Sequence, residues 1–168
     1  YGTNIFNGSI VTIAATGTIE IVTTNGDNST GFPAGTIGIF VGCRYTDPST
    51  SQLTFNQRWP TGTVASDAMA YIVDDPNAVF QAQADGAVTQ ADLGQNTYLA
   101  AVQSTSTGST INGNSTSALT STTATTSGMA FRIVDFVDGP DSAIGDAYTD
   151  LLVKFNPDSH SYLNKTGI

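Results

Sequence analysis

Residues 37–86 read IGIFVGCRYTDPSTSQLTFNQRWPTGTVASDAMAYIVDDPNAVFQAQADG, and this stretch decides the expected fold. It contains the only tryptophan, the only cysteine and two of the three arginines. The apolar run at 37–41 is bounded by turn residues, which is typical of a strand buried on both faces. Turns at Asp47-Pro48, Pro60 and Asp74-Asp75-Pro76 end successive strands, because proline pushes the preceding residue out of helical geometry. We therefore expect four short antiparallel strands and the core of the protein here.

Alternating apolar and polar residues predict further strands on both sides of this stretch. Residues 10–14 and 18–23 predict a hairpin, and residues 97–102 predict a later strand. The main strands are expected near 37–45, 68–73, 129–137 and 148–155. In the last two strands, the residues that are expected to face the core include Ile133, Leu151, Val153 and Phe155. In a strand near 53–56, Leu53 and Phe55 share one face. One helical turn is expected, capped by Thr89 and ended by Gly94.

The composition indicates an all-β protein with little helix. Only 39% of the 168 residues are apolar and 11% are charged, and a single glutamate stands among fourteen acidic residues. Aspartate, threonine, asparagine and glycine favour turns and strands over helices. We expect one domain over residues 1–168, an antiparallel β-barrel or sandwich with an N-terminal arm at 1–9.

Residues 104–128 form an insertion in which sixteen of twenty-five residues are serine or threonine and none is charged. Two interpretations stay open, a mobile linker or an ordered β excursion whose hydroxyl groups bond to backbone. Threonine favours strands, so an ordered excursion is the preferred interpretation, with Ile111 and Leu119 as its apolar anchors.

The charge balance and the hydropathy limit the partners that we expect. Five basic and fourteen acidic residues give a net charge of −9, which disfavours contact with nucleic acid and with anionic lipid. No run of eighteen apolar residues is present, so no membrane-spanning segment is expected.

The sequence offers little that could support catalysis or bind a cofactor, and we expect the protein not to be an enzyme. His160, the only histidine, stands in a polar tail, and Cys43 stands in an apolar strand where a thiol is inert filler. One cysteine and one histidine cannot make a zinc site. The aspartates at 138, 141, 146 and 150 raise a calcium hypothesis, but structural turns explain them better.

Two arginines stand beside aromatic residues, at Arg44-Tyr45 and Arg58-Trp59. Arginine and large aromatic side chains are enriched at the energetic centres of protein interfaces. An equally good interpretation is that each arginine stem covers an aromatic ring at the edge of the core. The predicted contact residues are these four together with Ile5 and Phe6 of the arm.

Several motifs together resemble a family of capsid decoration, or cement, proteins of tailed bacteriophages. They are GIFVGCRYTDP, AYIVDDPNAVFQAQADG, FRIVDFVDGPD and LLVKFN, preceded by TNIFNGS near the N-terminus. The resemblance covers most of the chain but not the insertion at 104–128. It implies a structural virion protein on the outer surface of a capsid, self-associated as a homotrimer and bound to the major capsid protein.

An alternative function from another class is a carbohydrate-binding or adhesin-like β domain. In that case the aromatic residues and the uncharged insertion would form a sugar-binding platform. The two functions place Tyr45, Trp59 and Tyr98 differently. A sugar-binding domain requires them in an open concave patch, whereas a decoration protein is expected to have them in the core or in subunit contacts.

Overall fold

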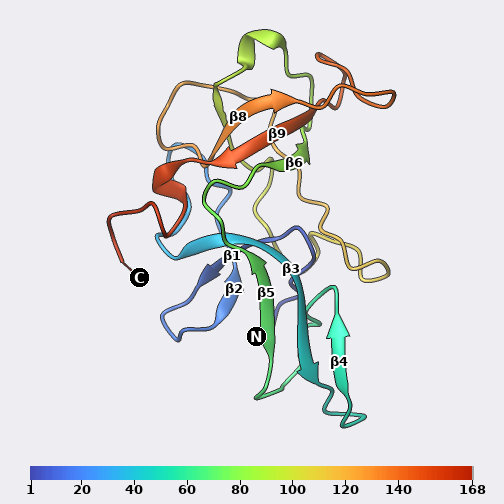
Figure 1. Cartoon of the computed structure of the whole chain (residues 1–168). Helices are drawn as coiled ribbons and strands as arrows, with labels where there is room; N and C mark the ends of the chain where they lie inside the picture. Colours follow the sequence, from blue (N-terminus) through green and yellow to red (C-terminus); the bar gives the residue numbers. More distant parts are fainter. Residues whose placement is uncertain (168) are drawn as a thin grey trace.

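The computed structural model describes residues 1–167 and has two antiparallel sheets with almost no helix (Figure 1). The first sheet contains β2 (Ile19–Ile21), β1 (Ile10–Ile13), β3 (Thr36–Thr46), β4 (Leu53–Asn56) and β5 (Met69–Val73). The second contains β6 (Phe80–Gln83), β9 (Asp150–Phe155), β8 (Phe131–Phe136) and β7 (Asn96–Thr97). The helical turns are η1 (Gln90–Asp92) and η2 (Pro157–Ser159). The all-β prediction is confirmed, in a sandwich-like rather than a closed-barrel form.

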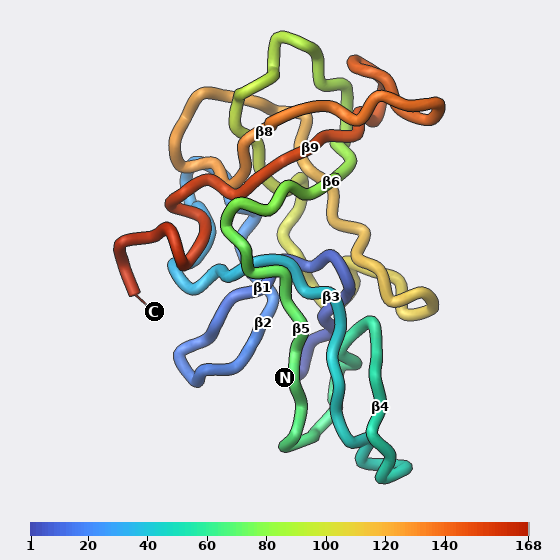
Figure 2. Tube along the Cα trace, in the orientation of Figure 1, coloured from blue at the N-terminus to red at the C-terminus, as the bar shows by residue number. Residues whose placement is uncertain are grey.

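Strand β3 is the longest strand and links the two halves of its sheet. Ile39 pairs with Ile10 of β1 on one edge and with Val73 of β5 on the other. Further along, Arg44 pairs with Phe55 of β4 and with Met69 of β5. Thus β5 follows one edge of β3, whereas β1 and then β4 share the opposite edge. A bulge between Phe40 and Gly42 accompanies a bend in β3, and the β4–β3–β5 half projects away from the second sheet (Figures 1 and 2).

Gly38 allows β3 and β5 to lie unusually close at the top of this projection. Its φ is +142°, a conformation that side chains disfavour. A Cβ atom at this position would collide with the carbonyl oxygen of Val73, which is backbone and cannot swing aside. Glycine is therefore a steric requirement of this pairing.

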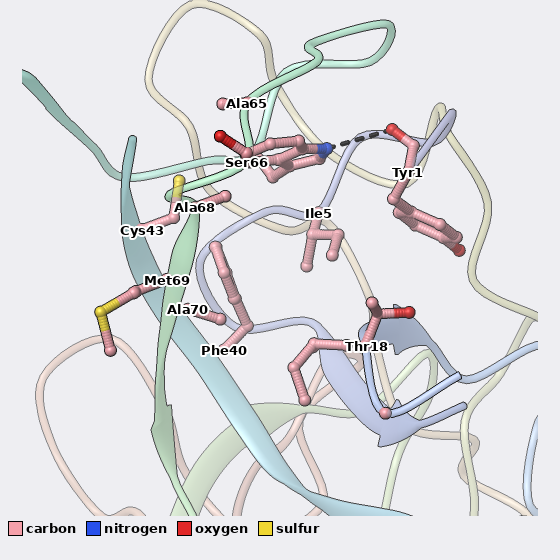
Figure 3. A pocket seen from close by; sticks show the side chains of 13 residues that line it. Tyr1, Ile5, Thr18, Phe40, Cys43, Ala65, Ser66, Ala68, Met69 and Ala70 are labelled. Carbon is pink, nitrogen blue, oxygen red and sulfur yellow. Dashed lines mark hydrogen bonds between the residues drawn. The ribbon is translucent and has the colours of Figure 1, made fainter. Parts of the chain in front are cut away.

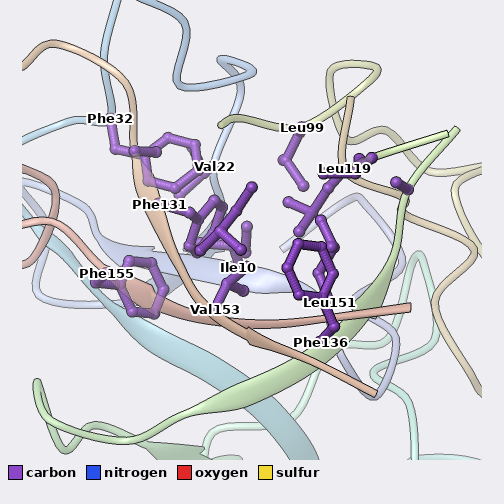
Figure 4. Close-up of a cluster of buried hydrophobic side chains, with 14 residues drawn as sticks. Ile10, Val22, Phe32, Leu99, Leu119, Phe131, Phe136, Leu151, Val153 and Phe155 are labelled. Carbon is purple, nitrogen blue, oxygen red and sulfur yellow. The ribbon is translucent and has the colours of Figure 1, made fainter. Parts of the chain in front are cut away.

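Two separate clusters of buried apolar side chains hold the fold together. The larger lies between the sheets, and Phe155 is at one side of it, near Phe131 and Phe32 (Figure 4). The ring centroid of Phe155 lies 4.9 Å from that of Phe131, 5.9 Å from Phe80 and 6.3 Å from Phe32. The smaller cluster lies on the other face of the first sheet and contains Ile5, Val11, Ile21, Ile37, Phe40, Cys43, Tyr45 and Trp59. Residues 37–86 do not form the core alone, because β8 and β9, which were expected among the main strands, supply much of the larger cluster.

The sheet of β1 and β3 forms the wall between these clusters. Neighbouring residues point to opposite faces of a strand, and Ile10 lies in the larger cluster whereas Val11 lies in the smaller. In β3, Ile39 packs against the larger cluster and Phe40 lies in the smaller one. The apolar run is thus covered on both faces as far as Phe40, as its pattern predicted, whereas Val41, which lies in the bulge, is 42% exposed.

A buried glutamine follows a predicted strand that is largely absent. Of the expected strand at 97–102, only Thr97 belongs to a strand, β7 (Asn96–Thr97). Gln103 is 2% exposed, and its amide accepts from Ile10 N (2.9 Å) and donates to Ile10 O (2.9 Å). This side chain therefore satisfies the backbone of β1 as a neighbouring strand would.

The C-terminal segment folds back on the start of β3. Ser161 N donates to Thr36 O (2.6 Å), and the Asn156 side chain donates to Met129 O (2.7 Å). His160 is 1% exposed, and its ring packs 5.4 Å from that of Phe155. The prediction of a polar tail around His160 was wrong, because the η2 turn directs this side chain inward.

The insertion at 104–128 is ordered through isolated bridges to the body of the protein. Leu119 is buried and bridges to Ala84 and Leu99, as expected of an anchor. Ile111 is 97% exposed, so its predicted anchoring role was wrong. Ile111 lies in a tight turn, in which Gly113 N donates a hydrogen bond to Ser109 O (2.8 Å) and the chain reverses direction.

Candidate functional site

Four of the six predicted contact residues lie inside the protein. Ile5, Phe6, Tyr45 and Trp59 are each less than 9% exposed. The rings of Tyr45 and Trp59 meet edge to face at 5.3 Å, and the backbones of Ile5 and Trp59 exchange two hydrogen bonds (3.1 and 2.8 Å). Folded in this way, these four side chains have little surface to offer a partner, which corrects their assignment as contact residues.

The two arginines lie on different sides of the first sheet. Arg58 donates from Nη1 to Asn4 Oδ1 (3.3 Å) and so fixes the arm beside Trp59. Arg44 lies on the opposite face, where its Nη2 donates to the Met69 sulfur (2.9 Å). Of the predicted residues, Arg44 is the one that borders an open apolar surface.

This surface is a group of exposed apolar side chains on the projecting half of the first sheet, which we name the apolar platform. Its members are Leu53 (54% exposed) and Phe55 (67%) on β4, and Met69 (51%), Tyr71 (43%) and Val73 (37%) on β5. The sequence pattern placed Leu53 and Phe55 correctly on one face. The alternation of apolar and polar residues shows which side chains share a face, but it does not show whether another part of the protein covers that face.

The strand register puts the members of the apolar platform on one side. Arg44 lies opposite both Phe55 and Met69, and directly opposed residues of antiparallel strands share a face. Ile39 lies opposite Val73 and packs against the larger cluster. The apolar platform is therefore on the same side of the first sheet as Ile39. At Ile39 this side is covered by the larger cluster, and at the apolar platform it is open.

One carboxylate at the margin of the apolar platform is already engaged within the chain. Asp67 accepts hydrogen bonds from Thr46 N (3.1 Å) and Thr46 Oγ1 (2.6 Å). These bonds, more than the nearby charge of Arg44, lower the pKa of this carboxyl below its usual value. Asp67 thus stays ionised through the neutral range and fixes the end of β3.

A cavity of about 350 Å³ lies at the smaller cluster, on the side of the sheet that Cys43 and Phe40 face (Figure 3). Its lining combines Ile5, Phe40 and Trp59 with the small side chains of Ala65, Ser66, Ala68 and Ala70. Burial raises the pKa of the Cys43 thiol to about 11. A thiol that stays protonated at neutral pH is a poor nucleophile, so the cavity holds an apolar lining and no activated group.

Two of the carboxylates near the candidate groups accept hydrogen bonds within the chain. Asp146 accepts from Ala143 N (2.8 Å) in the loop before β9, and Asp74 accepts from the Tyr162 hydroxyl (3.0 Å). In residues 1–167, no three histidine, cysteine or acidic side chains gather in a way that could hold a metal ion. Burial lowers the pKa of His160, whose Nε2 has no hydrogen-bond partner in this part of the chain.

Comparisons with known proteins do not assign this chain to a family. No protein-family model matches it, and searches of curated proteins and of solved structures gave no match either. Within residues 1–167, none of the helices has the length and apolar character needed to cross a membrane.

Proposed function

We propose that this protein is a structural component of a virion, which decorates the outside of a phage capsid and bridges adjacent subunits of the major capsid protein. The observation that carries the proposal is the apolar platform. Five large apolar side chains share one open face of a projecting sheet, and contiguous exposed apolar surface is typical of protein-binding sites. The motif resemblance described above supplies the identity of the partner.

The placement of the aromatic residues favours this function over carbohydrate binding. Sugar binding by stacking needs open aromatic faces, whereas Tyr45 is 4% and Trp59 is 8% exposed, and Tyr98 is half-buried. The three rings proposed for a sugar platform therefore pack in or near the core and do not form an open concave patch.

The charge of the chain supports an outer location. A net charge of −9 would repel packaged DNA, so the exterior of the shell is the favourable side. A protein that binds only the assembled shell stabilises it by mass action, and weak contacts repeated over a lattice sum to a large effect. A homotrimer would place three copies of the apolar platform around one axis of the shell.

The test is the thermal stability of particles with and without this protein. Particles that lack it are expected to release DNA at a lower temperature than complete particles, and adding back purified protein is expected to restore the release temperature. Equal release temperatures would reject the proposed function. Counting the copies around each capsid axis by electron microscopy tests the trimer separately.

A further inference from the structure

We propose that the apolar platform docks onto an apolar patch of the capsid protein that carries a carboxylate opposite Arg44. This inference rests on the proposed function and names the chemistry of its partner. The proposed contact surface consists of β4, β5 and residues 42–46 of β3. The buried residues Tyr45 and Trp59 are not part of it.

The apolar part of the contact follows from the five exposed side chains. Phe55 and Met69 flank Arg44 across the strands, and Leu53 and Tyr71 extend the same face along β4 and β5. Removing such surface from water is favourable in proportion to its area. The residues of β4 and β5 include no charged side chain, so an apolar partner meets no unpaired charge on these two strands.

The ionic part follows from the unused hydrogen-bonding capacity of Arg44. A guanidinium group has five N–H donors, and in residues 1–167 that of Arg44 makes one hydrogen bond, to the weak acceptor sulfur of Met69. The nearby Asp67 carboxylate is occupied by Thr46. A partner carboxylate could therefore take a two-pronged hydrogen bond from Arg44, which the apolar surroundings would strengthen.

Charge also argues against two other occupants. Stacking two copies face to face about a twofold axis would bring Arg44 toward Arg44 and double a charge of −9. Nucleic acid phosphate would face Asp67 at one end of β5 and Asp74 and Asp75 at the other. A surface that is apolar with a single carboxylate opposite Arg44 avoids the contact between two arginines, and it brings one negative charge near these aspartates where a nucleic acid brings a row of them.

The experiment uses empty shells assembled from the capsid protein that is encoded with this chain. Purified protein is added, the shells are sedimented, and bound protein is measured as a function of concentration. Phe55→Ser and Arg44→Gln are each expected to weaken binding by about 30-fold or more, the effect of losing an interface hot spot. Arg44→Lys is expected to bind between Arg44→Gln and the wild type, because lysine keeps the charge without the planar fork.

Matched controls change similar chemistry elsewhere. Tyr148→Ser removes a ring that is 62% exposed outside the apolar platform, and Lys154→Gln removes one positive charge from β9. Both are expected to bind like the wild type. Thermal unfolding of each purified variant, expected to match the wild type, separates a lost contact from a lost fold.

The outcomes separate this inference from the proposed function. No binding by the wild type rejects both. Tight binding by the wild type that Phe55→Ser and Arg44→Gln leave unchanged overturns this inference alone, and leaves the bridging function with another surface. A self-associated free protein that Phe55→Ser makes monomeric would also overturn it, because a second copy would then be the occupant.

Discussion

The two halves of β3, residues 36–41 and 42–46, differ in their surroundings. In the upper half, Ile39 faces the larger cluster and Phe40 faces the smaller, so both faces are covered within the chain. At residues 42–46, Cys43 and Tyr45 are buried in the smaller cluster on one face. On the other face, Arg44 lies between the exposed side chains of Phe55 and Met69. The comparison teaches that cover within the chain ends part-way along β3, and that at residues 42–46 the exposed apolar side chains come from the flanking strands β4 and β5.

The largest expected effect is a loss of stability from the covered face. Phe155→Ala removes a buried ring that packs against Phe131 and Phe80, and it should lower the free energy of unfolding by about 3–5 kcal/mol. Phe55→Ala, at an exposed position, should change it by about 0.5 kcal/mol or less. Urea denaturation of both variants measures the difference. Similar losses would show that the projecting half is not open.

The next effect concerns the close approach of β3 and β5. Gly38→Ala should cost about 2 kcal/mol or more, because the new methyl group meets the backbone of Val73 and the left-handed conformation is strained. Gly62→Ala is the control, since Gly62 also has a positive φ (+75°) but open space around it. If the two variants lose equal stability, the strand contact is less close than described.

A smaller effect is a pH dependence from His160. Burial lowers its folded pKa below 6.5, while the charges of Asp74 and Asp75 act in the opposite direction. As the pH falls through 6.5, the unfolded chain binds a proton that the folded chain does not, so stability should decrease. His160→Gln should lack this decrease between pH 7 and pH 5. The same pH dependence in both proteins would contradict the assignment.

The smallest expected effect is a difference in the rate of methionine oxidation, which compares an exposed with a buried methionine. Met69 is 51% exposed and Met129 is 7% exposed. Peroxide should convert Met69 to the sulfoxide well before Met129, because oxidation follows exposure of the sulfur. Mass spectrometry of the two peptides over time gives the rates. Equal rates in the folded protein would place Met69 under cover.

Much of the fold could be predicted because its signals are local. Turn prolines and alternation located β3, β5, β8 and β9, and they placed Leu151, Val153 and Phe155 correctly on the core face. These features depend on backbone geometry and side-chain period, which a short segment determines by itself.

The candidate site could be predicted only in part, because it depends on which distant segments meet. Of the pair Arg44-Tyr45, Arg44 borders the apolar platform, whereas Tyr45 points to the other face and is buried. The exposure of Phe55 follows from the end of the second sheet, a tertiary fact that the alternation of β4 does not contain. His160 was missed for the same reason, since its burial needs the η2 turn and the start of β3.

The position of β5 has a consequence for the protein before it meets a partner. β5 pairs with β3 alone among the strands of residues 1–167, so its other edge is unpaired, and its sequence Met-Ala-Tyr-Ile-Val contains no charge. Such an edge is a template for aggregation. Asp67 precedes it and Asp74-Asp75 follows it, as gatekeeper residues that repel a second edge at either end. These aspartates disfavour edge-to-edge pairing of free copies while the face between them stays open for binding.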